Sequence, residues 1–415
     1  MTKNVIISVG ILLSTSTAIF GWVPGELPRN YTFDGVFDSL VIMPHGIVVD
    51  RYNRIWIGCY GSCPLIVKNP DGTQAAFSPI DSVVIPGDTV IFLDRNCRGM
   101  ALDHEGNILY VKGNILIKLD VETGEGIARW TGPGTLTKPA VDTFGYIYVG
   151  TVVGVTPIHV LDPSTFELVY TIDLTPAAGF ARGIEVSKDG KDLWTGNLNP
   201  GGPVYHYHSD IPGVLPYELV EEISVDDYGN PIFQFTITTM DWGPDNTLWC
   251  SHETEDPQLQ SQNGLVVLNY NTMEYATLYM PEVPEGSYNG PRGVAFSLSG
   301  DTAYVVSFNG HRVWRYVVTT GVEEHNQLAS CYRLENHPNP FHHTTTITFT
   351  LFKGGFVDLR VYDIDGRIVK TLINRHMTPG SYEVQFDATT LPSGTYLCRM
   401  EVDGRVTTLK MLVVK

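Results

Sequence analysis

The stretch that decides the fold is PHGIVVDRYNRIWIG, residues 44–58, in which two apolar runs flank a polar turn. Alternation with a period of two residues places every second side chain of each run on one face of a strand. The turn YNR supplies residues that tolerate a positive φ, as a tight connection between antiparallel strands requires. The stretch therefore predicts two adjacent antiparallel strands.

This pattern recurs along the chain. Five further copies follow, at residues 98–112, 137–150, 182–196, 238–251 and 292–307. The copies start roughly 40 to 57 residues apart, the length of one four-stranded blade of a β-propeller. We therefore predict an all-β chain with a six-bladed propeller over residues 22–320, and residues 201–236 leave room for a degenerate seventh blade.

Two further features of the repeat bear on how the blades join. Each second strand carries an aromatic residue, which we expect to pack between neighbouring sheets: Trp56, Tyr110, Tyr148, Trp194, Trp249 and Tyr304. Residues 31–37 precede the first copy and would close the ring by joining the last blade. Such closure removes exposed sheet edges.

The copies resemble the grouping of NHL repeats with gluconolactonase-like (SMP-30-like) and streptogramin-lyase-like propellers, over residues 32–320. The resemblance implies the propeller fold. Propellers of this grouping include lactonases, lyases and pure binding modules, so the resemblance leaves the function open.

The chain changes character after the last copy. Residues 321–334 are polar and aperiodic and are predicted to be a linker, and residues 335–415 show short alternating strands between Pro and Gly turns, typical of a small β-sandwich. Within them stand Asn339-Pro340-Phe341, the VYDIDGR turn with Gly366, LPSGTY with Gly394, and an apolar-basic end at Lys415. These motifs are similar to the type A sorting domain of the type IX secretion system, an immunoglobulin-like module.

That resemblance implies secretion to the outer cell surface of a diderm bacterium, with the secretion machinery as partner. The other end of the chain agrees, because residues 1–21 have Lys3, an apolar stretch and small residues, as in a signal peptide read by the Sec system. No later segment approaches the ~20 apolar residues of a membrane span, so we expect no transmembrane segment in the mature form. The net charge of −18 argues against nucleic acids and anionic membranes as partners.

The residue before the glycine of each copy is predicted to lie at the mouth of the central channel, where propeller ligands bind. These residues are His45, Arg98, Thr137, Arg182, Thr238 and Arg292. Three arginines and a histidine would form a positive ring suited to an anionic glycan, a lactone or another extracellular anion. The alternative is structural, with the arginines paired to Asp94, Asp241 or Glu253.

Two other functions stay open. An enzyme of the lactonase or lyase type would use His45 as base, or His252 beside Glu253, because histidine titrates near neutral pH. Gluconolactonase-like relatives carry Asp and Asn at the pre-glycine position to hold a divalent cation, whereas arginine there would oppose one, so we predict no metal and no other cofactor. A purely structural surface scaffold is the third possibility.

The cysteines Cys59, Cys63 and Cys97 are candidates for a disulfide, which an exported protein permits. Loops at adjacent blades would bring Cys97 next to Cys59 or Cys63, and the expected bridge is Cys63–Cys97 or Cys59–Cys97. Either would stiffen the rim of the channel.

Overall fold

The computed structural model describes residues 27, 29–87, 90–152, 157–174, 181–197, 202–211, 216–224, 232–233, 236–256, 259–281, 289–318, 332–351, 355–364, 366–378, 380–402 and 405–415. The signal peptide expected at residues 1–21 lies outside these ranges. The regular secondary structure of the described residues consists of β-strands and one short 3-10 helix, η1 (Gln260–Gln262). Within this part of the chain, no helix is long and apolar enough to cross a membrane.

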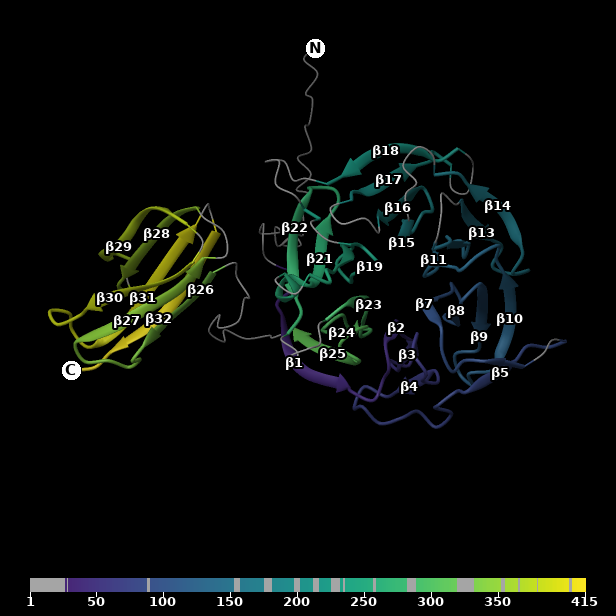
Figure 1. Ribbon diagram of the computed structural model, residues 1–415, viewed down its shortest axis with the longest axis horizontal. Coiled ribbons are helices and arrows are strands. Elements are labelled where there is room, and N and C mark those ends of the chain that lie inside the picture. Colours follow the sequence, from purple (N-terminus) through teal and green to yellow (C-terminus); the bar gives the residue numbers. More distant parts are fainter. Residues whose placement is uncertain are drawn as a thin grey trace, which may run out of the picture.

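Six sheets arranged in a ring make up the propeller (Figure 1). The first blade holds β2 (Pro44–Val49), β3 (Ile55–Cys59) and β4 (Ile66–Lys68), and the second holds β7 (Cys97–Leu102), β8 (Ile108–Lys112), β9 (Ile115–Leu119) and β10 (Gly126–Thr131). The third holds β11 (Ala140–Val141), β12 (Ile147–Val149), β13 (Ile158–Leu161) and β14 (Leu168–Ile172). The fourth holds β15 (Ala181–Val186), β16 (Asp192–Asn197), β17 (Val204–His208) and β18 (Glu218–Ile223).

The fifth blade holds β19 (Met240–Trp242), β20 (Leu248–His252), β21 (Gly264–Asn269) and β22 (Glu274–Tyr279). The sixth holds β23 (Pro291–Phe296), β24 (Thr302–Ser307), β25 (Arg312–Val318) and β1 (Tyr31–Asp38). The first strands of consecutive blades contact each other around the whole ring, so they surround the central channel. The described residues of the 201–236 stretch include β17 and β18, which complete the fourth blade and do not form a seventh.

The ring closes as predicted. β1 pairs antiparallel with β25, from Tyr31 opposite Val318 to Asp38 opposite Val313. The N-terminal strand thereby becomes the outer strand of the last blade (Figure 1). Closure ties the two ends of the propeller to one sheet.

An aspartate that directly follows the first strand of several blades stabilises the tight turn after it. Asp50 Oδ1 accepts hydrogen bonds from the backbone N–H groups of Tyr52 and Arg54, and its Oδ2 accepts one from Trp56 Nε1 at 2.8 Å. Asp103 and Asp142 bond the following turns in the same way. The turn residue Asn53 has φ 61°, in the left-handed region that the sequence predicted.

The core lies between blades. Trp56 of the first blade packs among side chains of the second, Trp194 among those of the fifth and Trp249 among those of the sixth. In the second blade Leu109 takes the equivalent position against the third blade, while Tyr110 turns back towards the first. Burial of these large side chains is the main force that holds neighbouring sheets together.

The first blade has three strands instead of four. A separate hairpin of β5 (Ser82–Val84) and β6 (Val90–Phe92) follows β4 and packs against the second blade, where a Cβ on Gly126 would lie 2.9 Å from the Val84 carbonyl oxygen. The hairpin carries three exposed apolar side chains, Val84, Val90 and Phe92.

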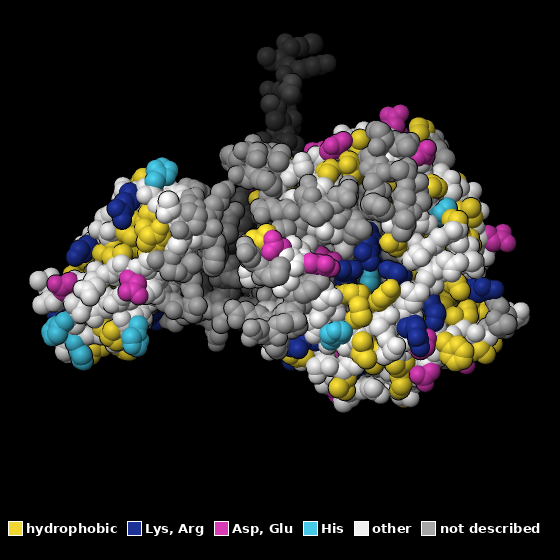
Figure 2. Space-filling model, in the orientation of Figure 1, with side chains coloured by type: hydrophobic (Ala, Val, Ile, Leu, Met, Phe, Trp, Pro, Cys, Tyr) yellow, Lys and Arg dark blue, Asp and Glu magenta, His cyan; other side chains and the backbone are white. Residues whose placement is uncertain are grey.

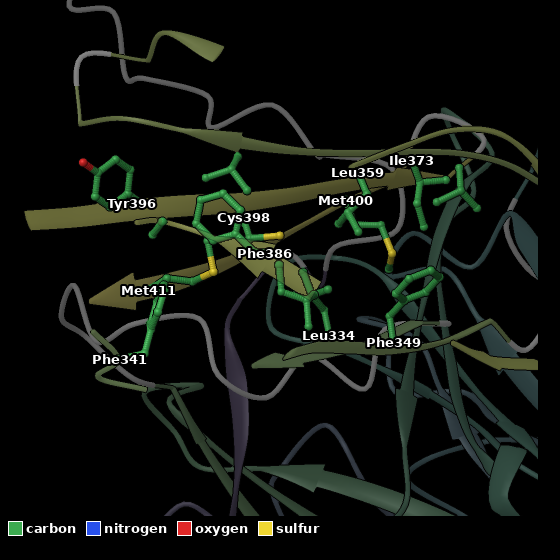
Figure 3. Packing of buried hydrophobic residues seen from close by; sticks show 14 of the residues in the cluster. Leu334, Phe341, Phe349, Leu359, Ile373, Phe386, Tyr396, Cys398, Met400 and Met411 are labelled. Carbon is green, nitrogen blue, oxygen red and sulfur yellow. The ribbon is translucent and has the colours of Figure 1, made fainter. Parts of the chain in front are cut away.

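The C-terminal region is a β-sandwich of two sheets, as predicted. One sheet holds β26 (Tyr332–His337), β27 (Thr344–Leu351) and β30 (Gly380–Asp387). The other holds β29 (Ile368–Met377), β28 (Gly355–Tyr362), β31 (Gly394–Val402) and β32 (Arg405–Val413). Phe341, Phe349 and Phe386 meet Met400 and Met411 between the sheets (Figure 3). β26 begins at Tyr332, so the last three residues of the expected linker belong to the sandwich.

Candidate functional site

Four of the pre-glycine residues gather at the centre of one face of the propeller. His45, Arg98, Arg182 and Arg292 are each the second residue of an innermost strand, in β2, β7, β15 and β23. Arg182 Nη2 donates to His45 Nε2 at 3.4 Å. Figure 2 shows dark blue cationic side chains around a cyan histidine at this centre. The register of the repeat therefore brings together residues that are far apart in the sequence.

The two remaining pre-glycine residues are buried and form hydrogen bonds within their own blades. Thr137 Oγ1 accepts a hydrogen bond from Gly150 N–H at 3.0 Å. Thr238 Oγ1 lies 2.9 Å from Ser251 Oγ. Both link the first and second strands of their own blades.

Two aromatic rings border the cationic cluster. The Arg98 guanidinium lies over the Tyr60 ring, and the Arg292 guanidinium lies over the Phe308 ring, each 4.5 Å from the ring centroid. The His45 ring meets Phe308 edge-on, with centroids 5.7 Å apart. The electron-rich ring faces stabilise the guanidinium groups without neutralising them.

One arginine of the cluster is paired with a carboxylate. Arg292 forms a two-point ion pair with Glu253, with 3.0 Å between Nε and Oε2, and both side chains are buried. A buried carboxylate in this position favours the structural interpretation for Arg292.

The other two arginines differ from Arg292. Among the described residues, no carboxylate lies within ion-pair distance of Arg98 or Arg182. Asp94 is engaged by Lys112 and Arg95, and Asp241 by Lys138. Arg98 Nε is buried without a hydrogen-bond partner among the described residues. Within the described part of the chain, three guanidinium groups and one carboxylate thus leave an excess of two positive charges.

Burial and mutual repulsion act on the charged forms in this cluster. Burial, with help from the Arg292 guanidinium, lowers the pKa of Arg182 to about 10, so Arg182 stays cationic at neutral pH. Burial and the three neighbouring arginines hold the pKa of His45 well below its usual value, so the imidazole is neutral. The excess charge therefore comes from arginine alone.

A second charged cluster lies deeper in the channel. Lys138 Nζ is 2.5 Å from Glu185 Oε1 and 3.1 Å from Asp241 Oδ1. Glu185 and Asp241 each follow the pre-glycine residue by three positions, and Lys138 stands where four of the other five copies have glycine. Burial raises the pKa of Glu185 to about 7, although the nearby Lys138 lowers it. This triad joins three blades and almost neutralises itself.

His252 and Glu253 do not act together. Glu253 faces Arg292 in the cluster, whereas burial of His252 lowers its pKa to about 4. Adjacent residues of an extended chain point in opposite directions, which separates the two side chains. The structure therefore gives the acid–base pair of the enzyme hypothesis no shared site.

Other histidines are engaged elsewhere. His206 Nε2 and His208 Nδ1 both bond Asp192 Oδ1, at 2.8 and 2.7 Å. Among the described residues, no three His, Cys, Asp or Glu side chains are grouped so as to hold a metal ion.

The cysteines take a different arrangement from the expected one. Cys59, Cys63 and Cys97 are all thiols, and the 2.8 Å contact joins Cys59 Sγ to Cys63 Sγ. Cys97 Sγ lies 3.9 Å from the Gly99 carbonyl oxygen, and a Cβ on Gly58 would be 2.5 Å from that sulfur. Cys97 thus fills the tight junction between blades, and the expected bridge from it to Cys59 or Cys63 is not formed.

Sequence reasoning missed Tyr60 and Phe308, although the repeat carries a signal for them. Each stands four residues after the aromatic of its second strand, as Glu253 does in the fifth blade. All three donate a backbone N–H to the residue two before the pre-glycine position: Tyr60 to Met43, Glu253 to Thr236 and Phe308 to Gly290. Aligning this second position across the copies would have placed Tyr60, Phe308 and Glu253 at the predicted site.

In the sandwich, the predicted sorting residues hold the last strand in place. Asn339 Nδ2 donates to the Lys410 carbonyl and Asn339 Oδ1 accepts from Leu412 N–H, at 2.9 and 2.8 Å. After Pro340, Phe341 is buried and exchanges backbone hydrogen bonds with Leu412 and Val414. Lys415 N–H donates to Ser393 Oγ at 2.9 Å.

The two predicted glycines differ. Gly366 has φ 79° in the turn after Asp363, which a side chain would strain. Gly394 opens β31, and a Cβ placed there would have no heavy atom within 4 Å, so sterics do not demand glycine at this position.

Comparison with known proteins identifies this C-terminal region. Residues 336–415 match the family described as a secretion system C-terminal sorting domain. No curated protein matches the chain in sequence. The chain therefore carries a type IX sorting domain that engages the secretion machinery, and it is exported to the cell surface.

Several solved structures are similar to this chain at low identity. PorZ, a surface component of the type IX secretion system of Porphyromonas gingivalis, is 14% identical with a TM-score of 0.41, covering 89% of this chain and 51% of that one. The extracellular domain of the putative one-component system BT4673 from B. thetaiotaomicron is 14% identical with a TM-score of 0.43, covering 93% and 59%. The Cps50 (Swd1) β-propeller domain of Myceliophteria thermophila is 10% identical with a TM-score of 0.47, covering 70% and 100%.

This chain spans about half of the first of these structures and 59% of the second. The fold and the sorting domain together define a class, that of surface-exported β-propeller proteins.

Proposed function

We propose that this protein binds an anionic extracellular ligand over the centre of the propeller face, through Arg98, Arg182, Arg292 and His45. The ligand class is a carboxylate- or sulfate-bearing glycan or a related small anion. The observation that carries the proposal is the pair of half-buried guanidinium groups, Arg98 and Arg182, that have no carboxylate partner among the described residues.

Unpaired arginines at this position are unfavourable for the fold alone. A buried charge without a partner lowers the stability of the fold, and replacing it with a neutral group commonly raises stability. If these arginines served the fold alone, each could be paired with a carboxylate, as Arg292 is paired with Glu253. An anion that accepts hydrogen bonds from Arg98 Nε and Arg182 would satisfy both groups.

The lactonase or lyase alternative lacks an equivalent support. Arg182 donates to His45 Nε2, and Glu253 is bound to Arg292 and not to His252. The scaffold alternative predicts that the arginines tolerate replacement and that no anion binds.

The test is titration calorimetry of the full chain with glucuronate, sulfate and, as neutral reference, glucose. Binding of the anions with an affinity that falls as salt rises is expected. Arg182→Gln should weaken anion binding at least ~10-fold, because a charge-assisted hydrogen bond contributes about 1.5–3 kcal/mol. Arg129→Gln, an exposed arginine of the outer strand β10, is the matched control. Equal affinities of both variants, or no anion binding by the wild type, would refute the proposal.

A further inference from the structure

The loop that carries Tyr60 into the cationic cluster is flanked by two thiols. Cys59 ends β3, Cys63 follows four residues later, and their Sγ atoms are 2.8 Å apart. A disulfide bond is about 2.05 Å long, so the two sulfurs stand within an ångström of bonding distance. Both side chains are buried, at 1% and 6% exposure.

Backbone hydrogen bonds hold this loop on both sides. Tyr60 N–H donates to the Met43 carbonyl at 2.9 Å, which ties the loop to its own blade. Cys63 N–H donates to the Asp94 carbonyl and Asn96 N–H to the Tyr60 carbonyl, at 2.8 and 2.9 Å, which ties it to the segment leading into the second blade. The proximity of the two sulfurs is therefore set by the fold and not by side-chain rotation alone.

We propose that Cys59 and Cys63 form a disulfide in the exported protein, closing a five-residue loop that fixes Tyr60 beneath Arg98. Export passes through an oxidising compartment in which disulfides form. The oxidant is an external disulfide, carried by an oxidase or by a small thiol such as glutathione. A thiolate of the pair attacks one sulfur of that disulfide and displaces a thiolate, and the second cysteine then attacks the mixed disulfide.

The step balances. Two cysteine thiols become one disulfide, the external disulfide is reduced to two thiols, and the two cysteine protons pass to the thiolates released. Cys63 suits the attacking role, because the hydrogen bond from Cys59 lowers the pKa of the Cys63 thiol. Cys97 does not, since burial raises the pKa of its thiol to about 12.

The consequence for the site rests on the proposed function. The Tyr60 ring lies 4.5 Å from the Arg98 guanidinium carbon and faces Phe308 at 5.7 Å. A closed loop restricts the ring to this position, so the arginine is held ready for an anion. Reduction should therefore weaken anion binding several-fold and leave the excess charge unchanged.

Trypsin provides a direct test on the full wild-type chain isolated after export to the periplasm. Cleavage after Arg54 and Lys68 releases residues 55–68, IWIGCYGSCPLIVK, which contain Cys59 and Cys63 and no other cysteine. Cleavage after Arg95 and Arg98 places Cys97 in the separate peptide NCR. The protein is alkylated under denaturing conditions without reductant before digestion.

The expected result is peptide 55–68 lighter by two hydrogen atoms and unalkylated, with NCR alkylated. Cys97→Ser should leave this result unchanged, while Cys63→Ser should leave Cys59 open to alkylation. Two alkylated cysteines in peptide 55–68 would overturn the proposal, and so would a cross-linked product of 55–68 with NCR. Anion titration before and after reduction tests the role of the loop separately: equal affinities would overturn the effect on Tyr60 while the peptide masses decide the disulfide.

Discussion

The two charged clusters of the channel differ in how they are balanced. Deep in the channel, Lys138 lies between Glu185 and Asp241, and each charge has an opposite partner. At the mouth, Glu253 pairs with Arg292, and no carboxylate of the described residues pairs with Arg98 or Arg182. Both clusters lie around the innermost strands, so the scaffold accommodates acidic partners for cations there. On the proposed function, an external anion would complete the pairing at the mouth, whereas the deep cluster joins three blades through its own ion pairs.

The largest effect should come from breaking the deep cluster. Lys138→Met leaves Glu185 and Asp241 buried and facing each other without a cation. The free energy of unfolding should fall by about 3–5 kcal/mol, the cost of removing one partner of a buried ion pair. Denaturant unfolding of the full chain measures it. Replacing all three residues with apolar ones should recover much of the loss, and a fall of less than about 1 kcal/mol for Lys138→Met alone would show that the triad does not join the blades.

Breaking the Arg292–Glu253 ion pair should lower the stability of the fold and strengthen anion binding. Glu253→Gln strands Arg292, so the free energy of unfolding should fall by roughly 3 kcal/mol, the lower end of the range because the Phe308 ring still covers the guanidinium. The same change adds one positive charge to the cluster, so glucuronate or sulfate should bind several-fold more tightly. Calorimetry on the folded variant measures this, and weaker anion binding would contradict the account.

A third effect concerns pH. The pKa of His252 is lowered to about 4 by burial, below its value of about 6.5 in the unfolded chain. The unfolded chain therefore binds a proton first as pH falls, and the free energy of unfolding contributed by the neutral His252 is lost between about pH 6.5 and 4. The free energy of unfolding should fall by roughly 2–3 kcal/mol over this window, and this fall should be absent in His252→Gln. Anion affinity at pH 7 should be the same in both proteins, because His252 does not face the arginines.

The smallest effect lies at His208, far from either cluster. The hydrogen bond to Asp192 raises the pKa of His208, so its contribution is complete below the unfolded pKa and is lost as pH rises through the folded one. The side chain is 38% exposed, so solvent screening keeps this contribution small. Thermal unfolding of His208→Gln should match the wild type above pH 8 and fall slightly below it near pH 5. A larger difference at high pH than at low pH would reverse this assignment.

The sequence predicted the mouth far better than the deep cluster, and the reason is periodicity. Arg98, Arg182 and Arg292 stand at one position of a visible repeat, so aligning the copies places them on one ring. Lys138 breaks the repeat by replacing a glycine, and its partners lie 47 and 103 residues further along. No local sequence pattern links these three residues, because only closure of the propeller ring brings them into contact. The partner of each arginine is hidden for the same reason, since Asp94, Asp241 and Glu253 are equal candidates until the strands fix which one faces Arg292.

The cysteines show a related limit. Loops on adjacent blades do approach each other, as the hydrogen bond from Cys63 N–H to Asp94 shows. The direction of the Cys97 side chain, however, depends on its place in β7, which turns the thiol into the junction with Gly58 and Tyr110. Backbone proximity was predictable, and side-chain direction was not.

The measurement that tests the central claim most directly is thermal unfolding of the Arg98→Gln/Arg182→Gln double variant, with and without sulfate at constant ionic strength. If Arg98 and Arg182 bind an anion, the wild type should gain stability in sulfate. The double variant should lose that gain, and its Tm in chloride should equal or exceed that of the wild type. A double variant that melts several degrees lower in chloride and still gains stability in sulfate would show that the arginines support the fold and that the anion binds elsewhere.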